Sequence, residues 1–148
     1  MAAVILFLSA CEQDEPQVVY DPTPYALNFG AFPAPNLPAD NMPTVTGVQL
    51  GRMLFYEKRL SKDNSQSCAS CHKQMDGFSD DRKFSIGVKG LEGRRQAMPL
   101  FNLPWHQYGF FWDGRAPTLR DQALRPIQDT LEMNESLVNV VTKLTADQ

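Results

Sequence analysis

The six residues SCASCH, from Ser67 to His72, constrain this chain more than any other part of the sequence. They place Cys68 and Cys71 three positions apart and put His72 directly after the second cysteine. The whole chain has three cysteines and two histidines, so this motif holds most of its soft metal ligands. Three kinds of site use such a grouping: a metal centre, a redox dithiol and a covalently attached haem.

A zinc centre and a redox dithiol both fit this motif poorly. Structural zinc needs four ligands, and outside the motif only Cys11 and His106 remain. A thioredoxin-like dithiol belongs beside a βαβ pattern, and the sequence shows no strand alternation of useful length. Cys-x-x-Cys-His instead matches the attachment motif of c-type haem. We therefore predict one covalent haem c bound through Cys68 and Cys71, with His72 as an axial ligand of its iron.

The composition is that of one small globular domain. The 148 residues are 43% hydrophobic and 21% charged, with a net charge of −3 at pH 7. A chain of this kind builds a single core. The mild acidity and the lack of a Lys/Arg stripe argue against a nucleic-acid partner.

The first residues are typical of an export signal. MAAVILFLSAC has an apolar run over residues 2–8 that is too short to span a bilayer, and LSAC resembles a bacterial lipoprotein box. We expect residues 1–10 to be a lipoprotein-type signal peptide and Cys11 to carry lipid that anchors the protein at a membrane surface. The alternative is an ordinary signal peptide with an incidental cysteine. Both predict export, with the periplasm as the location, where bacterial c-type haem is attached.

Residues 11–43 are expected to form a Pro-rich tether. Residues 12–43 hold seven of the chain's eleven prolines, and proline fixes φ and lacks an N–H, so neither a helix nor a sheet ladder is expected. The tether also contains aromatic residues, which leave open whether part of it packs along the domain in extended form: Tyr20, Tyr25, Phe29 and Phe32.

Three later stretches have helical periodicity. TVTGVQLGRMLFY predicts a helix that is capped by Thr44 or Thr46 and ends near Tyr56. TLRDQALRPIQ predicts a helix capped by Thr118, with Pro126 breaking or restarting it. NESLVNVVTKL repeats apolar residues at i, i+3, i+4 and i+7, with Asn134 as its cap. The fold class is therefore all-α with long loops.

Between residues 72 and 105 no comparable periodicity appears. So long a structureless stretch is uncommon in a compact domain. It becomes reasonable where a large prosthetic group supplies the missing core and the loops wrap around it.

Several further motifs make the chain resemble a known family. LGRMLFYEKRLSKDNSQSCASCH, GFSDDRKFSIGV, GRR and FFWDGRAPTLRDQALRPIQDTLEM are similar to the N-terminal, peroxidatic haem domain of bacterial di-haem cytochrome c peroxidases. That group also contains the MauG-type oxidases. The resemblance runs from about Val48 to Met133 or beyond. It implies that residues 44–148 form a cytochrome c-like helical domain wrapped around one covalent haem.

The resemblance also implies functional residues. The family's tryptophan between the two haems corresponds to Trp112, and its distal glutamine and glutamate correspond to Gln122 and Glu132. Glu132 would take a proton from hydrogen peroxide and return it to the leaving oxygen, with its pKa raised by burial, and Gln122 would orient peroxide or water. From spacing alone, a surface helix glutamine and a helix-start glutamate are the better interpretations, whereas Trp112 can be a core aromatic and have the functional role as well.

The chain departs from the family pattern in three places. Val88 stands where many members have a histidine that ligates the resting haem, so we expect an open or water-bound sixth position, as in the MauG-like branch, unless His106 or a methionine fills it. Gln96 replaces the usual Asn of a calcium site, although its amide oxygen can still bind calcium. No second Cys-x-x-Cys-His occurs, so the second haem domain is absent and we expect a fragment of a longer di-haem protein.

Two functions of different classes follow. The first is a periplasmic haem peroxidase domain that reduces hydrogen peroxide to water with electrons from a small cytochrome or cupredoxin; MauG-like oxidation of a protein substrate is a variant of it. The second is a mono-haem electron carrier in which Met98 or Met133 binds the sixth position. FWDGR with its downstream Gln122 and Glu132 has no role in a simple carrier, which favours the peroxidase. Family members are often dimers, so a homodimer is a further expectation.

Overall fold

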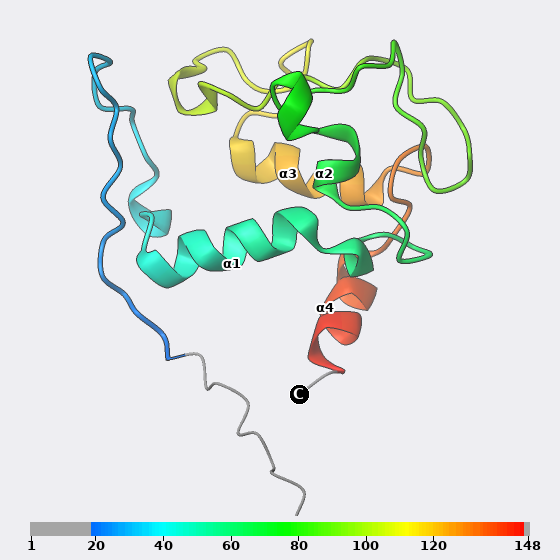
Figure 1. The fold of residues 1–148 in the computed structure, drawn as a ribbon, viewed down its shortest axis with the longest axis horizontal. Coiled ribbons are helices and arrows are strands. Elements are labelled where there is room, and N and C mark those ends of the chain that lie inside the picture. Colours follow the sequence, from blue (N-terminus) through cyan, green and yellow to red (C-terminus); the bar gives the residue numbers. More distant parts are fainter. Residues whose placement is uncertain (1–18, 147–148) are drawn as a thin grey trace, which may run out of the picture.

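The computed structural model describes residues 19–146, shown in colour in Figure 1. The expected signal peptide and Cys11 lie outside these residues. The helices are α1 (Val45–Tyr56), α2 (Cys68–Cys71), α3 (Leu119–Gln128) and α4 (Leu137–Thr145), with 3-10 turns η1 (Ala39–Asn41), η2 (Lys58–Leu60), η3 (Gln74–Asp76) and η4 (Leu103–Trp105). Over residues 19–146, β-structure is limited to isolated bridges. The predicted all-α class with long loops is therefore confirmed.

Two helices begin at the predicted caps. The Thr44 side chain accepts a hydrogen bond of 3.1 Å from the Gly47 N–H, and α1 ends at Tyr56 as expected. The Thr118 side chain accepts one of 3.1 Å from the Asp121 N–H at the start of α3. A side-chain oxygen at this position satisfies one of the unpaired N–H groups of the first turn, which is why such residues start helices.

Two details of the helix predictions are wrong. Pro126 neither breaks nor restarts α3, which continues to Gln128, because the only bond the proline removes is its own and the next one, from the Asp129 N–H to the Arg125 carbonyl at 2.9 Å, still closes the last turn. Asn134 does not cap α4. It adopts a left-handed φ of 51° in the turn after α3, and Ser136 caps α4 instead.

The hydrophobic core is small. Four buried residues from η2, α3, α4 and the turn between the two helices form it, with partly buried leucines around them: Leu60, Ile127, Met133 and Val140, then Leu54, Leu137 and Leu144. Lys143 of α4 locks this end of the domain, since its ammonium contacts Glu135 at 2.7 Å and donates to the Ser61 carbonyl at 2.7 Å. The rest of the interior is the cavity that is described in the next section.

Residues 19–43, the described part of the tether, form an extended loop at one side of the domain (Figure 1); most of them are exposed, and they contact the rest of the chain at a few points. The Trp105 indole N–H donates to the Pro33 carbonyl at 2.9 Å, and the rings of Phe29 and Phe32 lie 5.7 and 5.5 Å from the Trp105 ring. Asp40 pairs with Arg120 of α3 at 3.1 Å. These contacts join the tether to η4 and α3.

No helix within residues 19–146 is long and apolar enough to cross a membrane.

Candidate functional site

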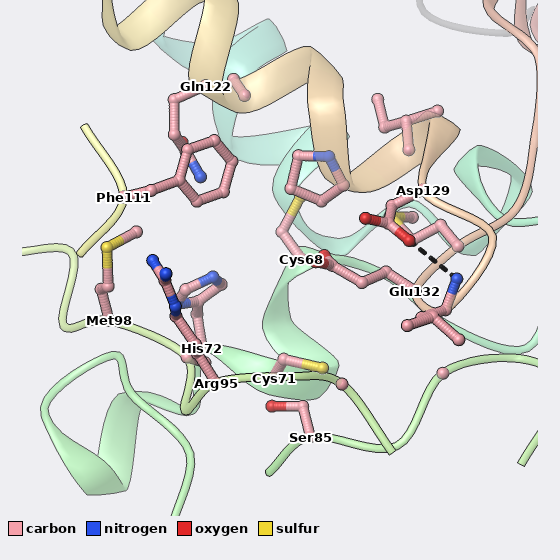
Figure 2. Close-up of a pocket in the computed structure, with 18 of the residues that line it drawn as sticks. Cys68, Cys71, His72, Ser85, Arg95, Met98, Phe111, Gln122, Asp129 and Glu132 are labelled. Atoms are coloured by element: carbon pink, nitrogen blue, oxygen red, sulfur yellow. Dashed lines mark hydrogen bonds between the residues drawn. The ribbon is translucent and has the colours of Figure 1, made fainter. Parts of the chain in front are cut away.

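A cavity of ≈1010 Å³ lies between α2, α3 and the loops that connect them (Figure 2). This volume is at the upper end of the roughly 300–1,000 Å³ that small-molecule and cofactor sites span. Its wall includes the predicted haem-attachment residues and the predicted distal residues together: Cys68, Cys71, His72, Gln122, Glu132 and Trp112. Residues separated by up to 64 positions in the sequence therefore meet around one space.

The cysteines are presented by α2, a single helical turn. Ser67 and Ser70 form a reciprocal capping box that starts this turn. Positions i and i+3 share one side of a helix, so Cys68 and Cys71 both line the cavity (Figure 2). Both are free and half-buried, and burial is the main cause that raises the pKa of each thiol. They are neutral thiols available for thioether bonds.

His72 ends the turn and presents a neutral imidazole to the cavity. Its Nδ1 lies 3.0 Å from the Phe78 carbonyl oxygen. Burial lowers the pKa of His72, although hydrogen bonds with the backbone of Phe78 and Met98 oppose this. With its other nitrogen next to a carbonyl, a half-buried neutral histidine is a typical metal ligand. These donors and the cavity volume fit a covalently bound haem.

Gln122 and Glu132 enter the cavity from α3 and from the turn after it. Gln122 is 8% exposed, so the surface-helix interpretation of this residue is wrong. Glu132 follows the end of α3 rather than starting a helix. Burial raises its pKa, the nearby Asp129 carboxylate adds to this, and Arg115 opposes it. The cavity therefore contains a carboxyl group with raised proton affinity.

Trp112 lies at the edge of the cavity rather than in a core. It is 59% exposed, and its indole N–H donates to the Gln96 carbonyl at 2.9 Å. The core-aromatic interpretation is therefore wrong for the described residues. The preceding Phe111 adopts a left-handed φ of 64°, uncommon for a bulky residue, and its ring projects into the cavity near Gln122 (Figure 2).

An ion-pair group next to Trp112 was not predicted as a unit. Asp113 contacts Arg95 at 2.7 Å and Arg115 at 2.9 Å. The Arg115 guanidinium is the main cause that lowers the Asp113 pKa to about 2. Arg115 also lies 3.6 Å from the Phe111 ring centroid. The sequence DGR already places Asp113 and Arg115 two residues apart. The contact of Asp113 with Arg95, 18 residues earlier, depends on the fold.

The other predicted ligand positions are placed as follows. Met98 lines the cavity, whereas Val88 is not part of its wall and donates its N–H to the Glu132 carbonyl at 2.9 Å. His106 follows η4 and stacks on Phe110 with ring centroids 6.0 Å apart. The Gln96 side-chain amide donates to the carbonyls of Asp80 and Arg82 at 3.0 and 3.3 Å. Calcium binding at Gln96 stays a prediction. Within the described part of the chain, no cluster of three His, Cys, Asp or Glu side chains forms a metal site.

Residues 45–148 match the family model described as di-haem cytochrome c peroxidase. The chain is 39% identical over 147 residues to the cytochrome c peroxidase Ccp of Escherichia coli K12, a match that covers 98% of this chain and 30% of that protein. It is 41% identical over 109 residues to the methylamine utilization protein MauG of Methylorubrum extorquens, covering 74% and 31% of the two chains.

Solved structures show the same similarity. A MauG-like protein associated with microbial copper homeostasis superposes with a TM-score of 0.74 at 36% identity, covering 83% of this chain and 37% of that one. The diheme peroxidase BthA of Burkholderia thailandensis superposes with a TM-score of 0.63 at 30% identity, covering 69% and 30%. The chain thus spans about a third of the length of the relatives that it matches.

Proposed function

The chain belongs to the di-haem cytochrome c peroxidase family, and from that premise we propose that it is the peroxidatic domain of a periplasmic enzyme that reduces hydrogen peroxide to water. One observation carries the proposal: Glu132, whose pKa is raised by burial, shares a cavity with Cys68, Cys71 and His72. A carboxyl group is costly to bury. A carboxyl group beside the haem-attachment residues therefore does not stabilise the fold, and proton transfer is a better reason for its presence there.

Cys68 and Cys71 would hold haem c by thioether bonds, and His72 would bind its iron. When bound, the haem supplies the iron centre and the redox equivalents at which peroxide is reduced. The second haem of the family lies outside this chain in the proposal. Electrons would come from a small cytochrome or cupredoxin.

The proton transfers are assigned to Glu132 and Gln122. Reduction consumes hydrogen peroxide, two electrons and two protons and yields two water molecules. The Glu132 carboxylate takes the proton from one peroxide oxygen and returns it to the other, which leaves as water. Asp129 raises the proton affinity of Glu132 and Arg115 limits that rise. The Gln122 amide orients the oxygen that Glu132 deprotonates.

The contacts favour the peroxidase over a mono-haem carrier. Met98 lines the same cavity as His72, and its backbone is close enough to influence the pKa of the His72 ring, so it lies beside the residue that would hold the haem iron. Met133 is 6% exposed and packs with Leu60 and Val140 in the core. The Val88 side chain has no atom that could bind iron, so it would not compete with peroxide for a bound haem. MauG-like oxidation of a protein substrate would use the same haem.

The remaining proposals concern the setting of the domain. Lipid on Cys11 would anchor it at a membrane surface, a calcium ion would bind near Gln96, and two copies would form a homodimer. Each follows from the sequence motifs or from the family resemblance.

The test of the proposal is Glu132→Gln in the haem-loaded chain, made in a host that matures c-type cytochromes. Its control is Glu92→Gln, at an exposed carboxylate. Stopped-flow absorption after mixing with hydrogen peroxide should show the reaction slowed by about 10²-fold or more in Glu132→Gln, the range that a positioned acid–base group contributes. The control should react like the parent chain. An unchanged rate in Glu132→Gln would remove this residue from the mechanism.

A further inference from the structure

Glu132 lies in a tight turn, and both its backbone N–H and its backbone carbonyl are hydrogen-bonded. Its N–H donates to the Asp129 carbonyl at 3.0 Å, and its own carbonyl accepts from the Val88 N–H at 2.9 Å. The Leu131 N–H donates to the Asp129 side chain at 2.8 Å, the dashed line in Figure 2. Two of these hydrogen bonds lie within the turn. The third comes from a distant loop, residues 85–93, and joins the turn to that side of the cavity.

Gly87 makes a second and closer contact from the same loop. A Cβ atom built on Gly87 would lie 2.0 Å from the Leu131 carbonyl oxygen and 2.7 Å from the Glu132 carbonyl oxygen. Both separations are below the 3.0 Å that real Cβ atoms keep. The φ of Gly87 lies outside the left-handed region, so close approach rather than backbone conformation requires glycine here. Any side chain would push the loop and the turn apart.

The loop has hydrogen bonds of its own and one to the segment before the SCASCH motif. The N–H of Gly87 donates to the Leu91 carbonyl at 3.0 Å, and the Gly90 N–H donates back to the Gly87 carbonyl at 2.9 Å. The Gln66 side chain donates to the Ile86 carbonyl at 2.8 Å. Gln66 directly precedes the SCASCH motif, so a short chain of contacts runs from the haem-attachment turn through Ile86 and Gly87 to Glu132.

We infer that Gly87 and Val88 form a positioning element for Glu132, in which the bare Cα of Gly87 and the N–H of Val88 set how far the Glu132 carboxylate enters the cavity. The inference rests on the proposed function of Glu132. Gly87 and Val88 are positioning residues, since they act through Glu132. Val88, which lacks a side chain able to bind iron, thereby gains a role through its backbone.

The test uses Gly87→Ala in the haem-loaded chain with Gly90→Asn as the matched control. Gly90 is in the same loop, has a φ of +71° and has no atom within 4 Å of its Cβ position. Asparagine tolerates the left-handed conformation, so the control adds a larger side chain without touching the turn. Glu132→Gln serves as the reference for loss of the carboxyl group.

The readout is the pH dependence of cyanide association with the ferric haem, because hydrogen cyanide must lose a proton as it binds. The groups facing Glu132 are Asp129, Arg115 and Cys71, and all are unchanged in these variants. Gly87→Ala should slow association by about tenfold, less than the roughly 10²- to 10⁴-fold that a positioned proton acceptor contributes, because the carboxyl group is displaced and not removed. Its pH midpoint should fall, because a displaced carboxyl group is less buried. Gly90→Asn should match the parent chain.

The outcomes separate the inference from the proposed function. A midpoint that vanishes in Glu132→Gln but stays in place in Gly87→Ala overturns the positioning role alone. A midpoint that survives Glu132→Gln overturns the role of Glu132 and the inference with it.

Hydrogen exchange of the unmutated haem-loaded chain gives a check that needs no variant to fold. The Val88 amide should exchange well below the rate of an exposed loop amide, because the Glu132 carbonyl accepts from it. Exchange at the exposed rate would show that the contact does not persist and would overturn the inference.

Discussion

The Nδ1 atom of His72 lies 3.0 Å from the carbonyl oxygen of Phe78. A carbonyl only accepts hydrogen bonds, so Nδ1 carries the proton and Nε2 keeps its lone pair. Phe78 adopts a left-handed φ of 57°, and its own N–H donates to the Lys73 carbonyl at 2.8 Å. The loop after the SCASCH motif therefore folds back to fix the ring of its histidine.

His72→Ala should remove the axial nitrogen without removing the attachment cysteines. We expect the haem to stay covalently bound through Cys68 and Cys71, with its absorption and EPR spectra changed and added imidazole restoring them. His106→Ala is the matched control, because His106 stacks on Phe110 and lies outside the cavity wall. If the spectrum changed in His106→Ala but not in His72→Ala, the iron ligand would be His106 and not His72.

Trp112→Phe should slow electron delivery to the site while the haem spectrum stays unchanged. The role proposed for this residue from the family resemblance is electron transfer between the two haems, and its exposed indole N–H donates to the Gln96 carbonyl at 2.9 Å. We expect steady-state peroxide turnover with a reduced cytochrome donor to fall by about tenfold, or roughly 1.4 kcal/mol in the barrier.

Trp105→Phe is the matched control for Trp112→Phe. Trp105 also donates its indole N–H to a backbone carbonyl at 2.9 Å, but to Pro33 of the tether. The Trp105→Phe variant should weaken the attachment of the tether, which would be measured as faster proteolysis within residues 26–36. Its peroxide turnover should be unchanged. An equal loss of turnover in both variants would indicate a packing effect and not electron transfer.

The parts of the fold that were predicted correctly are encoded locally. Thr44 and Thr118 cap their helices as expected, because the capping side chain and the N–H that it satisfies lie three residues apart. Pro126 was misjudged because a proline near a helix end removes only one bond. Asn134 was misjudged because a residue suited to capping is equally suited to a left-handed turn.

The residues of the candidate site also differ in how far the sequence alone predicts them. Cys68, Cys71 and His72 follow from a motif of five residues, whereas Gln122 and Glu132 needed the family resemblance. The contact of Gly87 with Leu131 was not predicted, since it joins segments more than 40 residues apart. A glycine that permits close approach looks in the sequence like any loop glycine. Only the packing distinguishes it.

Glu135→Gln should destabilise the fold at neutral pH. The Lys143 ammonium, 2.7 Å away, is the main cause that lowers the Glu135 pKa to about 2. A carboxyl group whose folded pKa is lowered stabilises the fold above its unfolded pKa, and this contribution is lost as pH falls from about 4.5 toward 2. Removing one partner of a buried pair costs roughly 3 kcal/mol. Urea unfolding of the haem-loaded chain at pH 7 and pH 3 should show a large difference from the parent at pH 7 and a smaller one at pH 3.

Glu132→Gln should have the opposite effect on stability. Burial raises the folded pKa of Glu132, so the charged form is disfavoured in the folded state. The cost is present in full above the folded pKa and disappears below the unfolded pKa, where both states are protonated. The neutral glutamine avoids this cost, so at pH 7 the variant should unfold at higher urea than the parent, and the two should converge at pH 3. Glu132→Gln would then be more stable and less active, as expected where a functional group is held in an unfavourable environment. A variant less stable than the parent at pH 7 would mean that the Glu132 carboxylate stabilises the fold, and burial could then not be the dominant influence on its pKa.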